Sequence, residues 1–399
     1  MKKVISTEKL PIKMWLEEIE DGALEQAKNL ANLPFAFKHI AIMPDSHQGY
    51  GMPIGGVLAT DGVVVPNAVG VDIGCGMCAV KTSLTDIDKE TLKKLMGEIR
   101  KVVPVGFSHH KEMQDFELMP DTNGISLKDF YPIIYSQYDS ALKQLGTLGG
   151  GNHFIEIQKG SDGHIWIMIH SGSRNLGKQV ADYYNNVAKE LNNMWFSLVD
   201  PKLDLAFLPI YSEEGKNYIR EMNYCVEFAL ANRKLMMDRI KKIFETVHLS
   251  GSFRGNIVIT FEPMINIAHN YARMENHFGQ NVMVHRKGAT SARKGEIGII
   301  PGSQGTKSYI VRGLGNKESF ESCSHGAGRK MGRKDAERRL NLEAEIKLLD
   351  DQGILHGIRG VHDLDEAPGA YKDIDVVMEN QKDLVEILVE LTPLAVIKG

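Results

Sequence analysis

The sequence predicts a mixed α+β protein with β-sheet at its centre. Apolar runs typical of buried strands and amphipathic helical segments do not alternate regularly enough for a doubly wound sheet. No internal repeat, low-complexity tract or linker divides the 399 residues. Candidate functional motifs extend from residue 45 to residue 325. We therefore expect one domain over residues 1–399, with residues 176–247 as a helical excursion from it.

Individual elements follow from hydrophobic periodicity. Buried strands are expected near Ile40–Met43, Val63–Val65, Ile165–Ile169, Ile257–Phe261 and Ile297–Ile300. Helices are expected at Leu176–Leu191, from about Tyr218 to Val247, and at Lys382–Leu391. In the long segment, apolar residues recur at spacings of three and four, which gives one stripe for the core.

Composition excludes several classes of protein. Hydrophobic content of 43% and charged content of 25% are typical of a soluble globular protein. No apolar run reaches the about 18 residues that a membrane span needs, and no secretory signal precedes the domain, so we expect the cytoplasm. Four cysteines are too few for a disulfide framework, and a net charge of −4 argues against a polycation that coats nucleic acid.

Basic residues are nevertheless concentrated between His285 and Leu340, where thirteen Lys or Arg stand against five Asp or Glu. A basic face beside the site would suit a polyanionic substrate. The alternative is a solvated helix, because Arg329–Arg339 alone holds six of the thirteen.

Six segments combine an apolar run with Asp, Asn, Cys or His and nearby glycine. They are Ile42–Gly49, Val71–Gly76, Gly149–Phe154, Ile169–Arg174, Val284–Gly288 and Cys323–Arg329. Strand ends of this kind can present metal ligands, while glycine lets a phosphate approach the backbone. Together the segments predict one composite, metal-dependent site for a phosphorylated substrate.

Asp72 and Cys75 are the first candidate ligands, because the glycine between them permits a turn that aims both at one centre. A thiolate can bridge two cations, and His153, His170 and His269 would complete a two-metal site. Two alternatives stay open for Cys75, a redox or zinc motif formed with Cys78 three residues later and a buried structural cysteine. Each histidine could likewise be an ordinary hydrogen-bonding residue.

The chemistry of these ligands leaves the metal open. Imidazole and carboxylate suit manganese, whereas a thiolate favours zinc or iron. Two cations would neutralise a triphosphate and stabilise an in-line phosphoryl displacement.

His325 differs from the other histidines because small residues surround it and Arg329 follows four positions later. An open backbone lets the ring approach phosphorus, and Arg329 could hold the phosphate oxygens. These features predict a nucleophile that forms a phosphoramidate, with a further metal ligand as the competing interpretation. The segment Pro301–Ser308 resembles a phosphate loop in composition, but ordinary turns look similar.

Taken together, the motifs make the chain resemble the RtcB family of RNA-splicing ligases. The resemblance runs from Ile42 to Gly399 through the segments above, Gly151–Glu156, His269-Asn270, Pro301–Ser303 and the terminal Val396–Gly399. It implies a single domain with central, mostly antiparallel β-sheets flanked by helices. It also implies ligation of RNA 3′-phosphate or 2′,3′-cyclic phosphate ends to 5′-hydroxyl ends, with GTP consumed.

The family's functional residues carry over as expectations. Two Mn²⁺ ions, or Zn²⁺ or another divalent cation in their place, would be held by Asp72, Cys75, His153, His170 and His269, with Cys75 bridging. The catalytic group would comprise His325, which carries GMP, with Asp45 and Arg329. Arg174 and Arg333 would contact RNA.

The nucleotide site is expected to recognise guanine. Glu156 can accept from N1–H and the exocyclic amine of guanine while Lys398 donates to O6, and Phe154 and Tyr371 are either stacking faces or core. The implied GTP contacts are Asn152, His153, Phe154, Ile155, Glu156, His269, Asn270, Pro301, Gly302, Ser303, Gln304, Ser308, His325, Gly326, Ala327, Gly328, Tyr371 and Lys398.

Two departures from the family pattern stand out. Gly332 occupies a position where serine is expected, and Cys78 adds a thiol that could form a disulfide with Cys75. Expected partners are transfer or ribosomal RNA with the ends named above and an accessory activating protein, but no membrane. Two other functions compete with the ligase: a metal-dependent phosphodiesterase acting on cyclic phosphate ends, and a non-enzymatic RNA-binding module.

Overall fold

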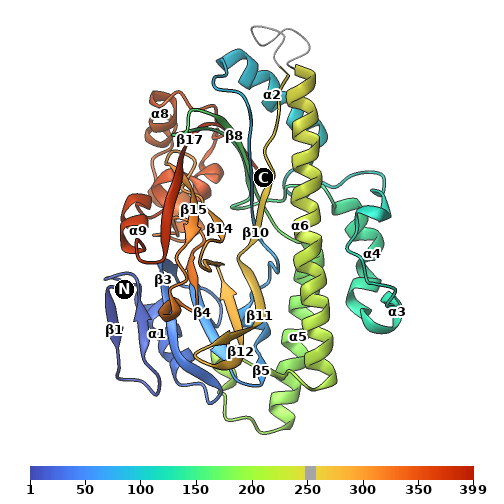
Figure 1. Ribbon diagram of the computed structural model, residues 1–399, viewed down its shortest axis with the longest axis vertical. Helices are drawn as coiled ribbons and strands as arrows, with labels where there is room; N and C mark the ends of the chain where they lie inside the picture. Colours follow the sequence, from blue (N-terminus) through green and yellow to red (C-terminus); the bar gives the residue numbers. More distant parts are fainter. Residues whose placement is uncertain (248–257) are drawn as a thin grey trace.

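The computed structural model describes residues 1–247 and 258–399. Two large β-sheets form its centre, and helices pack around them (Figure 1). Apart from β2 and β3, which run parallel, the paired strands of both sheets are antiparallel. The predicted α+β class with mostly antiparallel sheets is confirmed, whereas the single domain and its helical excursion stay predictions.

The first sheet has six strands in the order β1-β2-β3-β4-β12-β11. Their bounds are β1 Lys3–Ile5, β2 Ile12–Met14, β3 Ala36–His47, β4 Ile54–Thr60, β12 Gln280–Lys287 and β11 Asn270–His277. The second sheet has seven strands in the order β10-β6-β8-β7-β17-β15-β14. Their bounds are β10 Ile265–Ala268, β6 Gly76–Lys81, β8 Ile165–Ser171, β7 Phe154–Gly160, β17 Val385–Lys398, β15 Ser308–Gly313 and β14 Ile297–Ile300.

Two short strand pairs complete the β structure. They are β5 (Val63–Val64) with β9 (Leu208–Pro209), and β13 (Ala289–Ser291) with β16 (Ser322–Ser324). The helices are α1 Asp21–Ala31, α2 Lys89–Val102, α3 Leu127–Phe130, α4 Pro132–Gln144, α5 Arg174–Met194, α6 Glu213–Val247, α7 Arg333–Arg339, α8 Leu342–Asp351 and α9 Ile374–Asn380.

Helix α6 extends along the molecule beside β10 and β11 (Figure 1). Buried residues at spacings of three and four, among them Met222, Phe228 and Met236, give it one apolar stripe. The stripe joins two clusters of the core, one packed against α4 and α5 and the other against α2 and the second sheet. The predicted helices at Leu176–Leu191 and from Tyr218 to Val247 are therefore confirmed. No helix of the described residues combines the length and apolarity needed to cross a membrane.

The predicted helix at Lys382–Leu391 is wrong. Its leucines at helical spacing lie in and beside strand β17, which pairs with β15 on one side and β7 on the other. Backbone hydrogen bonds to two neighbouring strands outweigh a marginal helical propensity. β-branched Val385, Ile387 and Val389 also suit a pleated strand.

Four of the five predicted strands are present, within β3, β5, β8 and β14. The fifth, Ile257–Phe261, begins at a residue outside the described chain and is wrong from residue 258 onward. There Phe261 forms only an isolated bridge with Thr82, because β10 takes over the pairing with β6 from Ile265.

Candidate active site

The six motif segments converge where strands of both sheets end. Strands β3, β8, β12 and β16 end inside motifs, while β6 and β7 begin at the end of one. Residues 280 positions apart in the chain meet there, since Asp45 contacts His325 directly. The predicted composite site therefore exists as one cluster of side chains.

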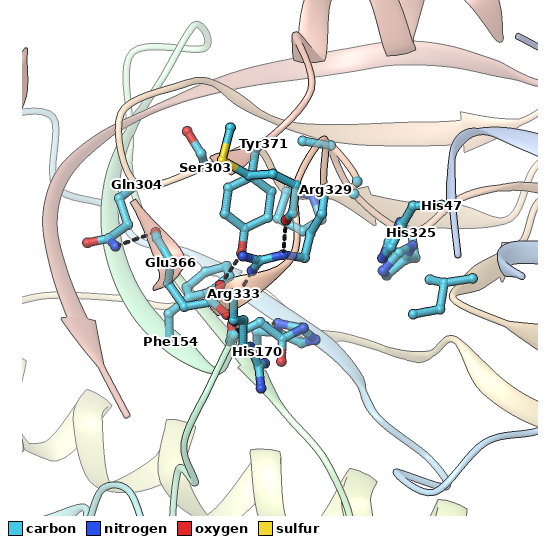
Figure 2. Close-up of a pocket in the computed structure, with 18 of the residues that line it drawn as sticks. His47, Phe154, His170, Ser303, Gln304, His325, Arg329, Arg333, Glu366 and Tyr371 are labelled. Atoms are coloured by element: carbon cyan, nitrogen blue, oxygen red, sulfur yellow. Dashed lines mark hydrogen bonds and ion pairs between the residues drawn. The ribbon is translucent and has the colours of Figure 1, made fainter. Parts of the chain in front are cut away.

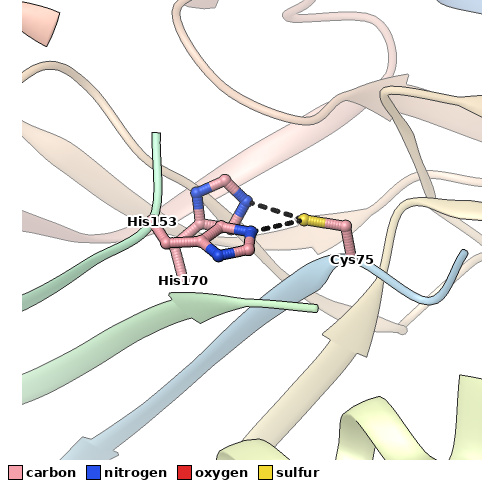
Figure 3. A group of neighbouring side chains, drawn as sticks. All are labelled: Cys75, His153 and His170. Atoms are coloured by element: carbon pink, nitrogen blue, oxygen red, sulfur yellow. Dashed lines mark hydrogen bonds between the residues drawn. The ribbon is translucent and has the colours of Figure 1, made fainter. Parts of the chain in front are cut away.

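Cys75, His153 and His170 form a buried triad whose ligand atoms all lie within 4.8 Å of one another (Figure 3). The Cys75 Sγ lies 3.4 Å from Nε2 of His153 and 3.3 Å from Nε2 of His170. The opposite ring nitrogens are held by backbone carbonyls, Nδ1 of His153 by Leu148 at 3.0 Å and Nδ1 of His170 by Asn152 at 3.1 Å. This outer hydrogen bonding fixes each ring so that Nε2 faces the thiol, as in metal sites.

Asp72 and His269 extend the triad on its two sides. Asp72 Oδ2 lies 3.2 Å from His153 Nε2, and His269 Nε2 lies 3.4 Å from His170 Nε2. Five donor atoms therefore converge in the order carboxylate, imidazole, thiol, imidazole, imidazole. All five predicted ligands come together, and this donor set fits divalent cations that accept nitrogen, oxygen and sulfur.

Burial sets the protonation of these groups in the metal-free protein. It lowers the pKa values of His170 and His269 well below the usual range, and the charges of neighbouring histidines lower them further. Burial also raises the pKa of the Cys75 thiol well above its usual range, with the Asp72 carboxylate adding to the effect. The imidazoles of His170 and His269 are thus ready to ligate, and a cation that binds at Cys75 must displace the thiol proton.

His325 is oriented by a buried carboxylate. Asp45 Oδ2 lies 2.6 Å from Nδ1 of His325 and also accepts from the backbone N–H groups of His325 and Gly326, at 3.0 Å and 3.3 Å. The ring lies 4.9 Å from that of His269, measured between centroids. With Nδ1 engaged, Nε2 is the nitrogen available for chemistry.

A cavity of about 550 Å³, the nucleotide cavity, opens beside His325 and His170 (Figure 2). Its volume lies within the range of small-molecule sites, which is about 300–1,000 Å³. Predicted residues in its wall are Asn152, Phe154, Glu156, His170, Pro301, Gly302, Ser303, Gln304, His325, Gly326, Ala327, Gly328, Arg329, Arg333, Tyr371 and Lys398. Most of the predicted nucleotide contacts therefore share one space.

Glu156 and Lys398 lie deep in this cavity. Burial raises the pKa of Glu156 to about 8, against the opposing charge of Lys398 and a hydrogen bond of 2.6 Å donated by Gln158. Burial lowers the pKa of Lys398, against the attraction of Glu366 and Glu156. The hydrogen bonds and opposite charges around this carboxylate and this amine do not fully offset the cost of burying them. The pair is therefore suited to a ligand that supplies matching donors and acceptors.

Residues 26–399 match the family described as tRNA-splicing ligase RtcB. The chain belongs to the RtcB family. It is 41% identical to the RNA-splicing ligase RtcB of Escherichia coli (strain K12), over 100% of this chain and 99% of that protein. It is also 32% identical to the tRNA-splicing ligase RtcB of Thermococcus kodakarensis, over 95% of this chain and 92% of that protein. The sequence-based prediction of an RtcB-family RNA-splicing ligase is confirmed.

Five of the nucleotide contacts carried over from the RtcB family lie outside the wall of the nucleotide cavity. His153 and His269 belong to the ligand cluster, which is the set of five candidate metal ligands described above. Asn270 lies beside this cluster, where its Nδ2 donates to the Asp72 carbonyl at 3.0 Å. Ile155 is buried in the core, and Ser308 Oγ accepts from Gly302 N–H at 3.1 Å behind the loop. Their contacts with GTP stay predictions.

Glu366 is a residue of the site that the sequence did not reveal. Its carboxylate accepts from Arg329 and Arg333, each at 3.0 Å, and from the Tyr371 hydroxyl (Figure 2). Burial opposes its ionisation, but the charges of Lys398 and Arg329 lower its pKa overall. No motif marks Glu366, so the sequence alone gave no signal for it.

The remaining predicted residues have the following places. Arg174 lies next to the ligand cluster, where its guanidinium donates to Thr147 Oγ1 at 3.3 Å and to the Gly106 carbonyl at 3.4 Å. Cys78 is a free thiol packed in the core with α2 and α6, so the disulfide considered with Cys75 is not formed. Gly332 lines the nucleotide cavity and is the N-cap of α7 without a capping side chain.

Proposed function

We propose that the protein is a GTP- and manganese-dependent RNA ligase. It joins RNA ends that carry a 3′-phosphate or a 2′,3′-cyclic phosphate to ends that carry a 5′-hydroxyl. The observation that carries this proposal is the His325 ring, held through Nδ1 by Asp45, beside the ligand cluster and in the wall of the nucleotide cavity. A nucleophile needs this combination of a fixed orientation and an adjacent substrate pocket.

In the first step, His325 Nε2 attacks the α-phosphorus of GTP, and the bond to pyrophosphate breaks. The buried Asp45 carboxylate keeps the proton on Nδ1, so the lone pair is on Nε2. In the second step, an oxygen of the RNA 3′-phosphate attacks the same phosphorus and breaks its bond to Nε2. In the third step, the 5′-hydroxyl oxygen attacks the RNA 3′-phosphorus, loses its proton, and GMP leaves. A cyclic phosphate is first opened by water to a 3′-phosphate.

Guanine recognition is assigned to the deep end of the nucleotide cavity. The Glu156 carboxylate accepts from N1–H and the exocyclic amine, Lys398 donates to O6, and Phe154 and Tyr371 flank the base. Adenine lacks this donor pattern and would leave the buried carboxylate without partners, which is costly. Arg329 and Arg333 lie in the same wall and would bind phosphate oxygens.

Two Mn²⁺ ions would be held by Asp72, Cys75 and His153 on one side and by Cys75, His170 and His269 on the other. When bound, these cations neutralise phosphate charge and stabilise the phosphoryl-transfer transition state. The substrate is transfer or ribosomal RNA with the ends named above, in the cytoplasm, and an accessory protein activates the enzyme.

The proposal is tested by ligation of a 3′-phosphate RNA to a 5′-hydroxyl RNA with Mn²⁺, with and without GTP. Joined product should form only with GTP. His325→Ala should form none, whereas His362→Ala, whose side chain is 95% exposed, should match the wild type. Opening of a cyclic phosphate without any GTP-dependent joining would instead identify a phosphodiesterase.

A further inference from the structure

A second cavity reaches the same chemical centre from another direction. It measures about 490 Å³, and its wall includes the ligands Asp72, Cys75 and His269 together with His325. Its volume again suits a molecule the size of a nucleoside. The guanine assigned to the nucleotide cavity does not use this space, although four expected GTP contacts, Asn152, His269, Asn270 and His325, are in its wall.

The two cavities meet at the reacting group. Gln48, Ile54, Asn152 and His325 line both of them. A group bound in the second cavity therefore faces the His325 ring while a nucleotide occupies the first. The order of the reaction requires this geometry, because the RNA 3′-phosphate must reach phosphorus on His325 while guanosine fills its own pocket.

Tyr50 stands at the mouth of the second cavity with its side chain 80% exposed. Its backbone is fixed, since its carbonyl accepts from Lys287 Nζ at 2.5 Å and from Met52 N–H at 2.7 Å. The preceding residue, Gly49, is held by two hydrogen bonds with the Gln26 side chain, at 2.6 Å and 3.1 Å. An exposed aromatic ring on a fixed backbone is a typical platform for an unpaired base.

We propose that the second cavity receives the terminal nucleoside of the RNA strand that carries the 3′-phosphate, with its base stacked on Tyr50. This inference rests on the proposed ligase function and assigns its RNA site. Three metal ligands and His325 in the wall are the groups that would hold and transform a 3′-phosphate. The strand that carries the 3′-phosphate takes part in two successive steps and must stay bound between them, whereas the 5′-hydroxyl strand takes part in one. A cavity that holds a nucleoside therefore suits the 3′-phosphate strand better.

The test measures the three reaction steps one at a time in four proteins, which are the wild type, Tyr50→Ala, Tyr50→Phe and Tyr211→Ala. Tyr211 is a matched control, because its side chain is 79% exposed and lies outside the walls of both cavities. The first measurement is guanylation of the protein with GTP and Mn²⁺ alone, which should be equal in all four proteins. Failure of the wild type here would reject the ligase function itself, independently of the role of Tyr50.

The second measurement is guanylation of a 3′-phosphate RNA whose 5′ end is blocked. Loss of base stacking should raise the KM for this RNA about tenfold in Tyr50→Ala. Tyr50→Phe and Tyr211→Ala should match the wild type. An RNA without its 3′-terminal base should bind the wild type as weakly as Tyr50→Ala binds the intact RNA, with no further loss in the variant.

In the third measurement, a pre-guanylated RNA is ligated to increasing amounts of a 5′-hydroxyl strand, and the rate of joining is recorded. The KM for the 5′-hydroxyl strand should be the same in Tyr50→Ala and the wild type. If this KM rises while the guanylation step is normal, the cavity belongs to the other strand and the proposal is overturned. Equal behaviour of Tyr50→Ala and Tyr211→Ala in every step would overturn it as well.

Discussion

Asp45 concentrates three hydrogen bonds on one carboxylate oxygen, from the His325 ring and from two backbone N–H groups. The side chain is fully buried, so water does not compete for this oxygen. Its proposed function is to fix the tautomer of the His325 ring and thereby determine which nitrogen reacts. An amide at this position could present its NH₂ group to the ring and would favour the wrong tautomer.

Asp45→Asn is therefore expected to slow transfer of GMP to His325 at least about 100-fold, the range of general acid–base and tautomer effects. Non-covalent binding of GTP should remain, because Asp45 lies outside the wall of the nucleotide cavity. Single-turnover formation of the guanylated protein, with GTP binding measured separately, checks both points. A normal transfer rate in this variant would contradict the assigned function.

Glu156 gives a prediction about pH. Its pKa is raised by burial to about 8, whereas the pKa of a glutamate in an unfolded chain is 4.5. The folded protein therefore binds the proton more tightly, so the free energy of unfolding falls as pH rises from 4.5 to about 8 and then levels off.

Glu156→Gln removes this titration. In the nucleotide-free protein, the variant should gain stability relative to the wild type as pH rises, on the order of 4 kcal/mol at pH 9. Near pH 4.5, the ionisation of Glu156 should contribute little to the difference in the free energy of unfolding between the two proteins. Urea denaturation across this pH range measures the difference, and a gap that does not change with pH would show that Glu156 ionises as it does in water.

At this scale the sequence predicted much of the site. Four of the candidate metal ligands and His325 were identifiable because glycine and apolar strand residues lie near each of them in the chain. The fifth, His269, follows the apolar pair Ile267-Ala268 and has no glycine nearby. Glu366 was not, because its function depends on Arg329, Arg333 and Tyr371, which only the fold brings to it. Tyr50 directly follows the motif Ile42–Gly49, but the sequence did not show that its ring is exposed beside a cavity.

At the scale of elements, helix α6 supports the ligand loops from behind. The buried guanidinium of Arg233 donates to the carbonyls of Gly74, at 3.0 Å, and Ser171, at 2.8 Å. These residues directly precede and follow the ligands Cys75 and His170. The next residue toward the N-terminus, Asn232, bonds the backbone of Thr147 and Gly172 in the same loops.

Arg233→Met should therefore destabilise the protein by about 3 kcal/mol, because it leaves buried carbonyls without donors. It should also weaken metal binding about 10- to 100-fold, the usual effect of losing an outer hydrogen-bonding group. Lys234→Met is the control, since Lys234 is exposed and pairs with Asp238 on the same helix. Chemical denaturation and competition with a metal indicator measure the two effects. Equal metal affinity in both variants would argue against support by α6.

Elements were predicted well where local pattern and tertiary packing agree, as in α5 and α6. The prediction for residues 385–391 was wrong because leucine spacing suggested a helix, whereas these residues pair with β15 as a strand, which continues along β7 from Leu391. This error matters for function, since β17 is the strand that carries Lys398 into the nucleotide cavity.

At the scale of the whole molecule, the site belongs to neither sheet alone. His325 and Asp45 come from β16 and β3 or their ends, whereas His153 and His170 come from β7 and β8 of the second sheet. Among the candidate ligands, His269 lies between β10 of the second sheet and β11 of the first, so metal binding should hold the two sheets together and stabilise the fold.

Mn²⁺ at about one hundred times its dissociation constant should raise the free energy of unfolding by about 2.7 kcal/mol, and a chelator should reverse the gain. Cys75→Ala should lose most of this increment. Cys225→Ala, which removes an equally buried thiol from α6, should retain it. Thermal denaturation with increasing Mn²⁺ gives the comparison, and an unchanged increment in Cys75→Ala would exclude the thiol as a ligand.

The most direct test of the account is incubation of the protein with Mn²⁺ and GTP radiolabelled at the α-phosphate, followed by mapping of the labelled peptide. The wild type should carry an acid-labile guanylate on His325, and His325→Ala should carry no label. A wild-type protein that stays unlabelled, or a label on any other residue, would contradict the account.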